Sequence, residues 1–469
     1  MFFSRAKEGF IKESKSLRAS IRDGMASAVT TGTADSYLIP FGIFLRATTL
    51  QIGLLATLPQ FVGAFSQVVG AWLSDRITSR RTLLVGAASA NAMVWLAIGL
   101  LSFTASSQIE SIFALIVLAL VYQVTLNLSA PIWNSLIGDL VPLKERGQFF
   151  GIRNQWLGFI SFLTLIICGQ ILDFTKDLGL ARWGFLVIFL GAGISRLIAA
   201  YWLAQYEDPP FSSSEENKFS LLQFVLRIPQ SNFAKFVLFV ATMQFSVAIA
   251  GPYFSVYWLN DLKLSYTEFT GIIAAQAISQ FLSMKSWGRL SDSYGNRKIL
   301  KVCSFGIASI PFFWLLSDNY FYMAGLQVYS GIFWAGFNIA VGNFLFDAVT
   351  PPKRARCAAY QAFITGIFIL IGAVIGGVIV KHLPENYSFF YGLDWNPTSP
   401  LLVLFLISGI LRFLFASFLI RKFHEVREVT GISTWRLLSA FSGIRSLDSV
   451  TDYWVDLFRD QEEGKEEEN

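Results

Sequence analysis

An acidic residue in the middle of an apolar run is the strongest candidate for chemistry in this sequence. Asp35 stands in the segment TTGTADSYLIPFGIF, near the centre of an apolar run at 24–45, roughly 16 Å along a helix from either end of the run. A charge at that depth of a bilayer costs several kcal/mol, so it usually faces a cavity and has a function. We expect Asp35 to take up and release a proton, or to help bind a cation, because a desolvated acid can exchange protons near neutral pH. A static ion pair is the plain alternative.

Two arginines lie inside other apolar runs. Arg196 and Arg412 occupy matching places in the runs 183–204 and 401–421. Arginine keeps its charge there, so each needs an acid, backbone carbonyls or an anionic ligand as a partner. The sequence leaves open whether either arginine does more than hold helices together.

These residues are positioned by a strongly apolar chain. Of its 469 residues, 54% are hydrophobic and 15% are charged, which is more apolar and less charged than a soluble domain. A helix needs about 20 apolar residues to cross the roughly 30 Å hydrocarbon layer, and isolated strands would leave backbone groups unpaired there. The sequence therefore predicts about twelve spanning helices, near 24–45, 51–73, 82–104, 111–138, 150–172, 183–204, 233–258, 267–289, 299–317, 321–346, 358–381 and 401–421.

The chain contains an internal duplication. The polar stretch AWLSDRITSRR at 71–81 returns in the second half as GRLSDSYGNRK at 288–298, each time between two long apolar runs. Arg46–Ala56 matches Lys263–Ala274 in the same way. Similarity over several separated regions indicates two copies of one unit of six helices.

Two six-helix units with a GxLxDxxGxRK-like loop after the second and eighth helices resemble the major facilitator superfamily of secondary transporters. The likeness covers nearly all of the apolar part of the chain. The first loop keeps Asp75, Arg76 and Arg80 but has Ala71 and Thr78 where the pattern has glycine. The second loop fits the pattern through Gly288, Leu290, Asp292, Gly295, Arg297 and Lys298.

The resemblance implies a cytoplasmic gate. In the family, the aspartate of this loop is thought to hold the two bundles together in the outward-open state, a role that falls here to Asp75 and its copy Asp292. A second pair of signatures, DLVPLKERG at 139–147 and DAVTPPKRA at 347–355, follows the fourth and tenth helices, where acid and base could exchange partners as the bundles move. Helix-stop loops and membrane-surface anchors are the plain alternatives. The expected gate residues are Asp75, Arg76, Arg80, Asp139, Arg146, Asp292, Arg297, Asp347 and Arg354.

The resemblance also implies a central cavity lined by helices 1, 4, 7 and 10, with contributions from helices 2, 5, 8 and 11. The arginine-bearing helices 6 and 12 are then peripheral. Amides and aromatics suit a neutral or amphipathic organic molecule, because they offer hydrogen bonds and flat apolar faces without fixed charge. Each of them could instead be an interhelical packing residue. The expected cavity residues are Tyr37, Gln60, Gln123, Asn127, Trp133, Gln244, Tyr253, Tyr257, Gln276, Trp334 and Asn338.

The placement of basic residues predicts the orientation of the chain. Threading the helices from an inner N-terminus leaves most Lys and Arg on the inner side, which predicts cytoplasmic termini in a plasma (inner) membrane. The net charge of +5 then reflects this asymmetry, and no nucleic acid is needed to explain it. The predicted units are a basic amphipathic segment 1–22, bundles 23–204 and 233–421, a cytoplasmic linker 205–232 and a cytoplasmic tail 422–469.

The sequence predicts neither an enzyme nor a cofactor. It has no phosphate-cradling loop, metal triad or nucleophile elbow, and Cys168, Cys303 and Cys357 show neither disulfide nor metal spacing. We expect a monomeric secondary transporter in the lipid bilayer, such as a symporter, that moves a small organic solute by alternating access and is driven by a proton or cation gradient. An exporter or flippase of amphipathic compounds and a non-transporting receptor or scaffold are left open.

Overall fold

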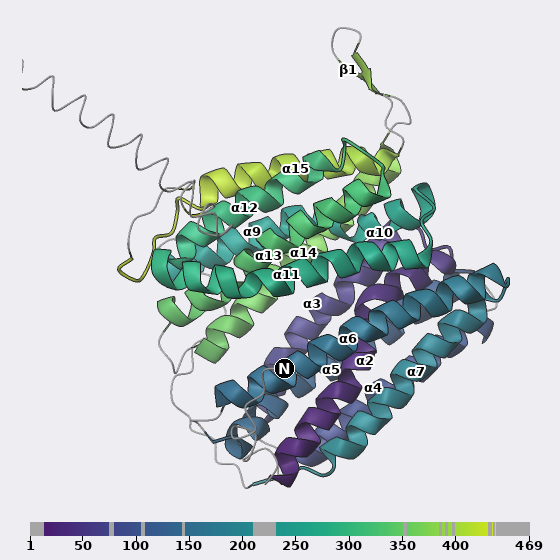
Figure 1. The fold of residues 1–469 in the computed structure, drawn as a ribbon, viewed down its shortest axis with the longest axis vertical. Coiled ribbons are helices and arrows are strands. Elements are labelled where there is room, and N and C mark those ends of the chain that lie inside the picture. The colour runs from purple at the N-terminus through teal and green to yellow at the C-terminus, as the bar shows by residue number, and fades with distance from the viewer. Residues whose placement is uncertain are drawn as a thin grey trace, which may run out of the picture.

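The computed structural model describes most of the chain, and the described part is almost entirely helical, as the apolar runs predict (Figure 1). The described residues are 14–74, 79–104, 108–142, 146–209, 231–349, 354–383, 387–389, 393–395 and 399–429, together with 434 and 437.

The N-terminal half holds one group of long helices, drawn from purple to blue in Figure 1. Ser14 caps the first of them by accepting from the Leu17 N–H, so this helix begins well before the apolar run that predicted it and takes in part of the predicted segment 1–22. The helices are α2 (Lys15–Phe44), α3 (Thr49–Ser74), α4 (Arg80–Thr104), α5 (Gln108–Leu140), α6 (Arg146–Asp177) and α7 (Ala181–Leu203).

The C-terminal half forms a second group, drawn from teal to yellow. Its first predicted helix is interrupted after α9 by a Gly-Pro turn, because Pro252 has no N–H for the helical ladder. The elements are α9 (Asn232–Ala250), η2 (Gly251–Tyr253), α10 (Phe254–Val256), η3 (Tyr257–Asp261), α11 (Tyr266–Tyr294), α12 (Asn296–Phe313), α13 (Tyr320–Ala348), α14 (Arg354–His382), the antiparallel strands β1 (Tyr387–Phe389) and β2 (Leu393–Trp395), and α15 (Pro400–Leu419).

Among the described residues, eight helical stretches are long and apolar enough to cross a membrane, and the protein is therefore a multi-pass membrane protein. Helices α2, α3, α11 and α12 lie outside this set, so the predicted number of twelve spanning helices stays a prediction. The eight stretches are Arg80–Phe103, Ile109–Leu140, Phe149–Asp177, Ala181–Leu203, Asn232–Asp261, Tyr320–Ala348, Cys357–His382 and Pro400–Leu419.

Helix packing repeats between the two halves. In the N-terminal half α3 packs on α5, α4 on α7, and α2 on both α6 and α7. The C-terminal half has the matching pairs: α11 on α13, α12 on α15, and α9 on both α14 and α15. Across the halves, α3 packs on α14 and α6 packs on α11, and these two contacts are copies of each other under the duplication.

The backbone carries a local mark of the same duplication. Among the described non-glycine residues, only Arg46 (φ 64°) and Lys263 (φ 54°) have a left-handed backbone, and the sequence comparison had aligned these two residues. Each ends the first helical passage of its half and starts the turn to the next helix, where a left-handed residue is a common way to terminate a helix. We call the end of the molecule that contains these turns the distal end, and the end that contains Arg80, Asp139 and Asp347 the proximal end.

Candidate functional site

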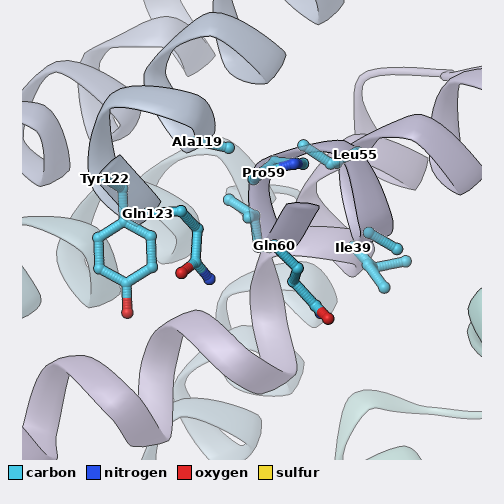
Figure 2. Close-up of a pocket in the computed structure, with 9 residues that line it drawn as sticks. Ile39, Leu55, Pro59, Gln60, Ala119, Tyr122 and Gln123 are labelled. Atoms are coloured by element: carbon cyan, nitrogen blue, oxygen red, sulfur yellow. The ribbon is translucent and has the colours of Figure 1, made fainter. Parts of the chain in front are cut away.

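A small cavity lies between α2, α3 and α5 in the N-terminal half (Figure 2). Its volume is about 190 Å³, and two of the expected cavity residues, Gln60 and Gln123, line it. Figure 2 shows the amide groups of both side chains on the same side of Pro59 and Ala119. No charged side chain lines it among the described residues, which suits a neutral ligand. The other lining residues include Leu38, Ile39, Leu55, Pro59, Ala119 and Tyr122.

A third expected residue, Asn127, holds Gln123 in place. The Asn127 Nδ2 donates to the Gln123 backbone carbonyl and to Gln123 Oε1, each at 2.9 Å. Gly63 on α3 makes room for this pair, because a Cβ there would lie 2.5 Å from Asn127 Nδ2. Asn127 is therefore a neighbour of the cavity that acts through Gln123.

A proline in α3 adjoins the cavity. Pro59 lies inside α3 and has no N–H, so the carbonyl of Leu55, four residues earlier, lacks its regular helical donor. Both residues line the cavity. The regular hydrogen bonding of α3 is therefore interrupted beside the two side-chain amides of the cavity.

Two expected cavity tyrosines lie instead where the halves meet. The Tyr37 hydroxyl is 2.6 Å from both the Leu165 carbonyl and the Thr270 Oγ1 of α11. The Tyr253 hydroxyl donates to the Ala373 carbonyl at 2.6 Å and packs directly against Gly53 of α3. A side chain at position 53 would collide with that hydroxyl, so this glycine is needed for the close approach of the halves.

The remaining expected cavity residues do not line this cavity. Tyr257 donates to Asp318 at 2.6 Å, and Trp133 is covered by the Arg153 guanidinium, 4.3 Å from the ring centre. The others are on the C-terminal half, three half-buried and one exposed: Gln244, Gln276, Trp334 and Asn338.

Four predicted site residues have side chains that lie outside the described part of the structure. Asp35 lies on α2, but its side chain is outside the described part of the structure, as is that of Arg146 at the start of α6. Asp75 and Arg76 lie wholly outside the described residues. Their expected roles in coupling and gating stay predictions.

The distal end is closed by a carboxylate that the sequence analysis missed. Asp173, near the end of α6, accepts the backbone N–H groups of Tyr266 and Thr267, each at 2.7 Å. These two groups open the first turn of α11 in the other half, where free N–H groups favour an anion. The Lys176 ammonium lies 5.5 Å from the centre of the Tyr266 ring and reinforces the contact.

At the proximal end, the expected gate acid Asp139 pairs within the N-terminal half. Arg80, only 1% exposed, bonds Asp139 at 2.7 Å. It also lies 3.6 Å from Asp208, in the segment after α7. This segment therefore fastens the start of α4 to the end of α5.

The C-terminal half has a related arrangement with a different cation. Asp347 accepts from Asn296 at 2.6 Å and pairs at 2.9 Å with Arg427, from the segment after α15. Arg427 is also 4.0 Å from the exposed Asp292. No ion pair between described residues joins the two halves at this end.

Two further gate arginines bond to backbone carbonyls. Arg297 Nε donates to Ile420 at 3.2 Å. Arg354 donates to Val349 at 3.0 Å and to Phe346 at 2.9 Å. Both contacts lie inside the C-terminal half, so they fix helix ends there in this conformation.

Arg196 has an acid nearby that the sequence analysis did not identify. Its Nη1 donates to Ser27 Oγ at 2.5 Å, and Ser27 is 3.5 Å from Asp23. Asp23 is buried, accepts from the Tyr206 hydroxyl at 2.6 Å and lies 3.8 Å from Arg153. Burial, with the nearby charge of Asp23 adding to it, raises the pKa of Tyr206 well above its ordinary value, so this phenol remains a donor to the carboxylate.

Arg412 has a structural partner instead. It is 3% exposed, and its Nη1 donates to the Ile307 carbonyl at 3.2 Å. Pro311 lies four residues later in α12 and has no N–H to offer that carbonyl. Arg412 thus supplies the hydrogen bond that proline removes from α12.

Comparison with known proteins places this architecture in a family. The family model described as Major Facilitator Superfamily matches residues 24–250 and again 236–461. Among structures, that of the nucleoside transporter NupG is 14% identical with a TM-score of 0.65 and covers 87% of this chain and 100% of NupG. That of a D-xylose-proton symporter is 13% identical with a TM-score of 0.65 and covers 89% of this chain and 98% of the symporter.

Sequence relatives include a multidrug resistance protein and a major facilitator-type transporter. The match to the multidrug resistance protein MdtG of Proteus mirabilis is 24% identical and covers 68% of this chain and 75% of MdtG. The match to the major facilitator-type transporter psiT2 of Psilocybe cubensis is 27% identical, covers 30% of this chain and spans only 28% of psiT2. The two family matches, one on each half, agree with the repeated helix packing. The chain belongs to the Major Facilitator Superfamily, a family of membrane transporters.

Proposed function

We propose that this protein is a secondary active transporter that moves a small, neutral or amphipathic organic solute by alternating access. It works as twelve spanning helices in two bundles and as a monomer, in a plasma (inner) membrane with both termini cytoplasmic. The observation that carries the proposal is the asymmetry of the contacts between the halves. Among the described residues, polar contacts across the halves lie at the distal end, through Asp173 and Tyr37, whereas the described ion pairs of the proximal end stay within each half.

This asymmetry supports one state of a rocking cycle. In such a cycle two rigid bundles close one end around the solute while the other end opens. The distal contacts are few and polar, so they can be exchanged for hydration without dismantling either hydrophobic core. In the opposite state, the proximal acids and bases would join the halves, which is the latch role expected of Asp75 and Asp292.

Asp35 remains our choice for the coupling group, on the strength of its position in the sequence and on α2. The test is proteoliposome uptake of a solute panel of sugars, nucleosides, amino acids and drugs, with and without a pH or cation gradient. Asp35→Asn should abolish the gradient dependence but leave exchange of labelled solute across the membrane. Gradient-driven uptake that is unchanged in Asp35→Asn would remove Asp35 from the mechanism.

Export of amphipathic compounds is the second candidate function. The name of MdtG and the apolar walls of the cavity support it. Inverted vesicles distinguish the two directions, because an exporter would accumulate a fluorescent amphipathic dye inside them when energised. A receptor or scaffold without flux would transport no member of the panel in either direction, and Asp35→Asn would then have no effect.

A further inference from the structure

The two seams between the halves are copies of each other, but they are not closed over the same length. One seam joins α3 to α14, and the other joins α11 to α6. Helices α3 and α11 begin 217 residues apart, at positions 49 and 266, and helices α6 and α14 begin 208 residues apart, at positions 146 and 354. Each residue of one seam therefore has a definite copy in the other.

At the distal end both seams are closed. Gly377 of α14 packs against Leu50 of α3. Its copy on α6, Gly169, packs in the same way against Thr270 of α11. The distal ends of the two seams therefore match, each with a glycine pressed against a helix of the opposite half.

Nearer the proximal end, the two seams differ. Gly366 of α14 is buried, and a Cβ there would lie 3.7 Å from the Phe61 Cα and from the Ala64 Cβ of α3. A Cβ at its copy on α6, the exposed Gly158, would have no described neighbour within 4 Å. Helices α3 and α14 thus stay in contact from Leu50 to Phe61, which is roughly 16 Å along α3, whereas α6 has separated from α11 at the matching level.

Aromatic packing shows the same difference. The centre of the Phe363 ring on α14 lies 5.8 Å from the centre of the Phe61 ring on α3. The copies of these two residues are Gln155 on α6, which is exposed, and Ile278 on α11, which is 45% exposed. Figure 1 shows the axes of α6 and α11 diverging from the distal end toward the proximal end. The proximal opening between the halves therefore lies along α6 and α11.

Resting on the proposed transport function, we propose that α3 and α14 form a hinge that stays closed throughout the transport cycle, and that α6 and α11 form the gate that opens and closes. When the proximal end closes, Gly158 packs against Ile278 as Gly366 packs against Phe61 in this structure. The halves rotate about one seam and part at the other, in place of separating equally along both.

The chemistry of the two seams fits this division of roles. The contacts of α3 with α14 described above are made by glycines, aliphatic side chains and aromatic rings, and exposing such groups to a water-filled passage is unfavourable. The distal contacts of α11 with the N-terminal half are polar, through Asp173 and the Thr270 hydroxyl. Water can replace these hydrogen bonds when the seam parts, so this seam is the one that we expect to move.

Distances across the two seams test the hinge and the gate without a solute. Spin labels at Phe65 and Ile371 report on the hinge, and labels at their copies, Leu282 and Leu163, report on the gate; all four side chains are exposed. In double electron–electron resonance, Asp173→Asn should add a shorter distance to the gate pair, because the proximal end closes as the distal end opens, and should leave the hinge pair unchanged. A change in both pairs, or in neither, would overturn the proposal.

Matched disulfides test the same roles during transport. Phe61→Cys with Gly366→Cys bridges the hinge where the two backbones already approach, and Ile278→Cys with Gly158→Cys bridges the gate only when it closes. In proteoliposomes that contain a transported member of the solute panel, oxidation should leave flux through the hinge variant and abolish flux through the gate variant, and a reductant should restore it. Loss of flux in the oxidised hinge variant, or continued flux in the fully oxidised gate variant, would overturn the proposal.

Gly158→Leu provides a test that does not depend on oxidation. Its side chain fits the open gate but prevents the close approach of α6 and α11, so flux should be lost while thermal unfolding is unchanged. Gly191→Leu, at an exposed glycine of α7 that also has no described neighbour within 4 Å of a Cβ, is the control and should transport like the wild type.

The same measurements separate the two proposals. If the wild type transports a solute of the panel and Gly158→Leu transports it equally well, this inference fails and the transport function stands. If the wild type transports no solute of the panel, the proposed function fails and this inference fails with it.

Discussion

The contact of Asp173 with the start of α11 predicts a measurable shift in the conformational equilibrium. Its two oxygens accept two N–H groups at 2.7 Å each, and both groups belong to the positive end of a helix. In Asp173→Asn one oxygen remains as an acceptor, and the new amide nitrogen opposes the second N–H. The substitution therefore weakens the closed distal end without removing volume.

The magnitude follows from the geometry. A hydrogen bond to a charged group contributes about 1.5–3 kcal/mol net, and the helix dipole adds about 0.3–1 kcal/mol. Asp173 is half-buried and partly hydrated, so the loss should lie at the lower end, about 2 kcal/mol. At ~1.4 kcal/mol for each factor of ten, this shifts the equilibrium toward an open distal end by roughly 30-fold.

Double electron–electron resonance measures this shift as a change in the distance between two spin labels, one on each half. Ile109, at the distal end of α5, and Leu316, in the turn just after α12, are 75% and 70% exposed and are suitable label sites. Asp173→Asn should add a longer distance to the distribution, and Asp177→Asn, an exposed acid on the same helix, should not. If the distribution in Asp173→Asn matches the wild type, Asp173 does not hold the halves together.

Two further predictions concern the buried charges. Arg412→Met should lower the free energy of unfolding by about 1–3 kcal/mol, because the Ile307 carbonyl loses its donor. In a protein that also carries Pro311→Ala, the restored N–H at position 311 satisfies that carbonyl. Arg412→Met should then change the free energy of unfolding very little. Thermal unfolding of the four proteins measures this cycle, and equal losses in both backgrounds would contradict the pairing. Asp23→Asn should lower the free energy of unfolding by about 1.5–3 kcal/mol, because the half-buried Arg153 and Arg196 lose their nearby acid. Asp292→Asn, which removes the exposed pair with Arg427, is the control and should lower the free energy of unfolding by under about 1 kcal/mol in the same assay. Equal losses in the Asp23 and Asp292 variants would show that the buried contacts of Asp23 do not stabilise the fold.

Periodicity and duplication carried most of the fold prediction. The apolar runs located the long helices, and the residues Arg46 and Lys263 that the duplication aligns share a left-handed backbone in the structure. These features are local, so the sequence contains them directly. The start of α2 was missed because Ser14 caps a polar first turn that hydropathy does not reveal.

The site was harder to predict because its contacts join distant segments. Gln60 and Gln123 line a small cavity within the N-terminal half, and the Tyr37 hydroxyl contacts Thr270 where the halves meet. Their expected place in one central solute cavity stays a prediction. Asp173 could not be assigned from sequence, since its partners are backbone N–H groups of another helix. Asp23 had a possible signal in its helical spacing of four residues from Ser27, on one face of α2.

Locking the distal end tests alternating access most directly. Asp173 Oδ2 lies 2.7 Å from the backbone nitrogen of Thr267, so Asp173→Cys together with Thr267→Cys places two thiols across the halves, in a chain whose native Cys168, Cys303 and Cys357 are buried. Oxidation should abolish solute flux in proteoliposomes while solute binding persists, and a reductant should restore flux; each single variant should transport under both conditions. Flux that continues at the wild-type rate with the disulfide fully formed would contradict the rocking of two halves.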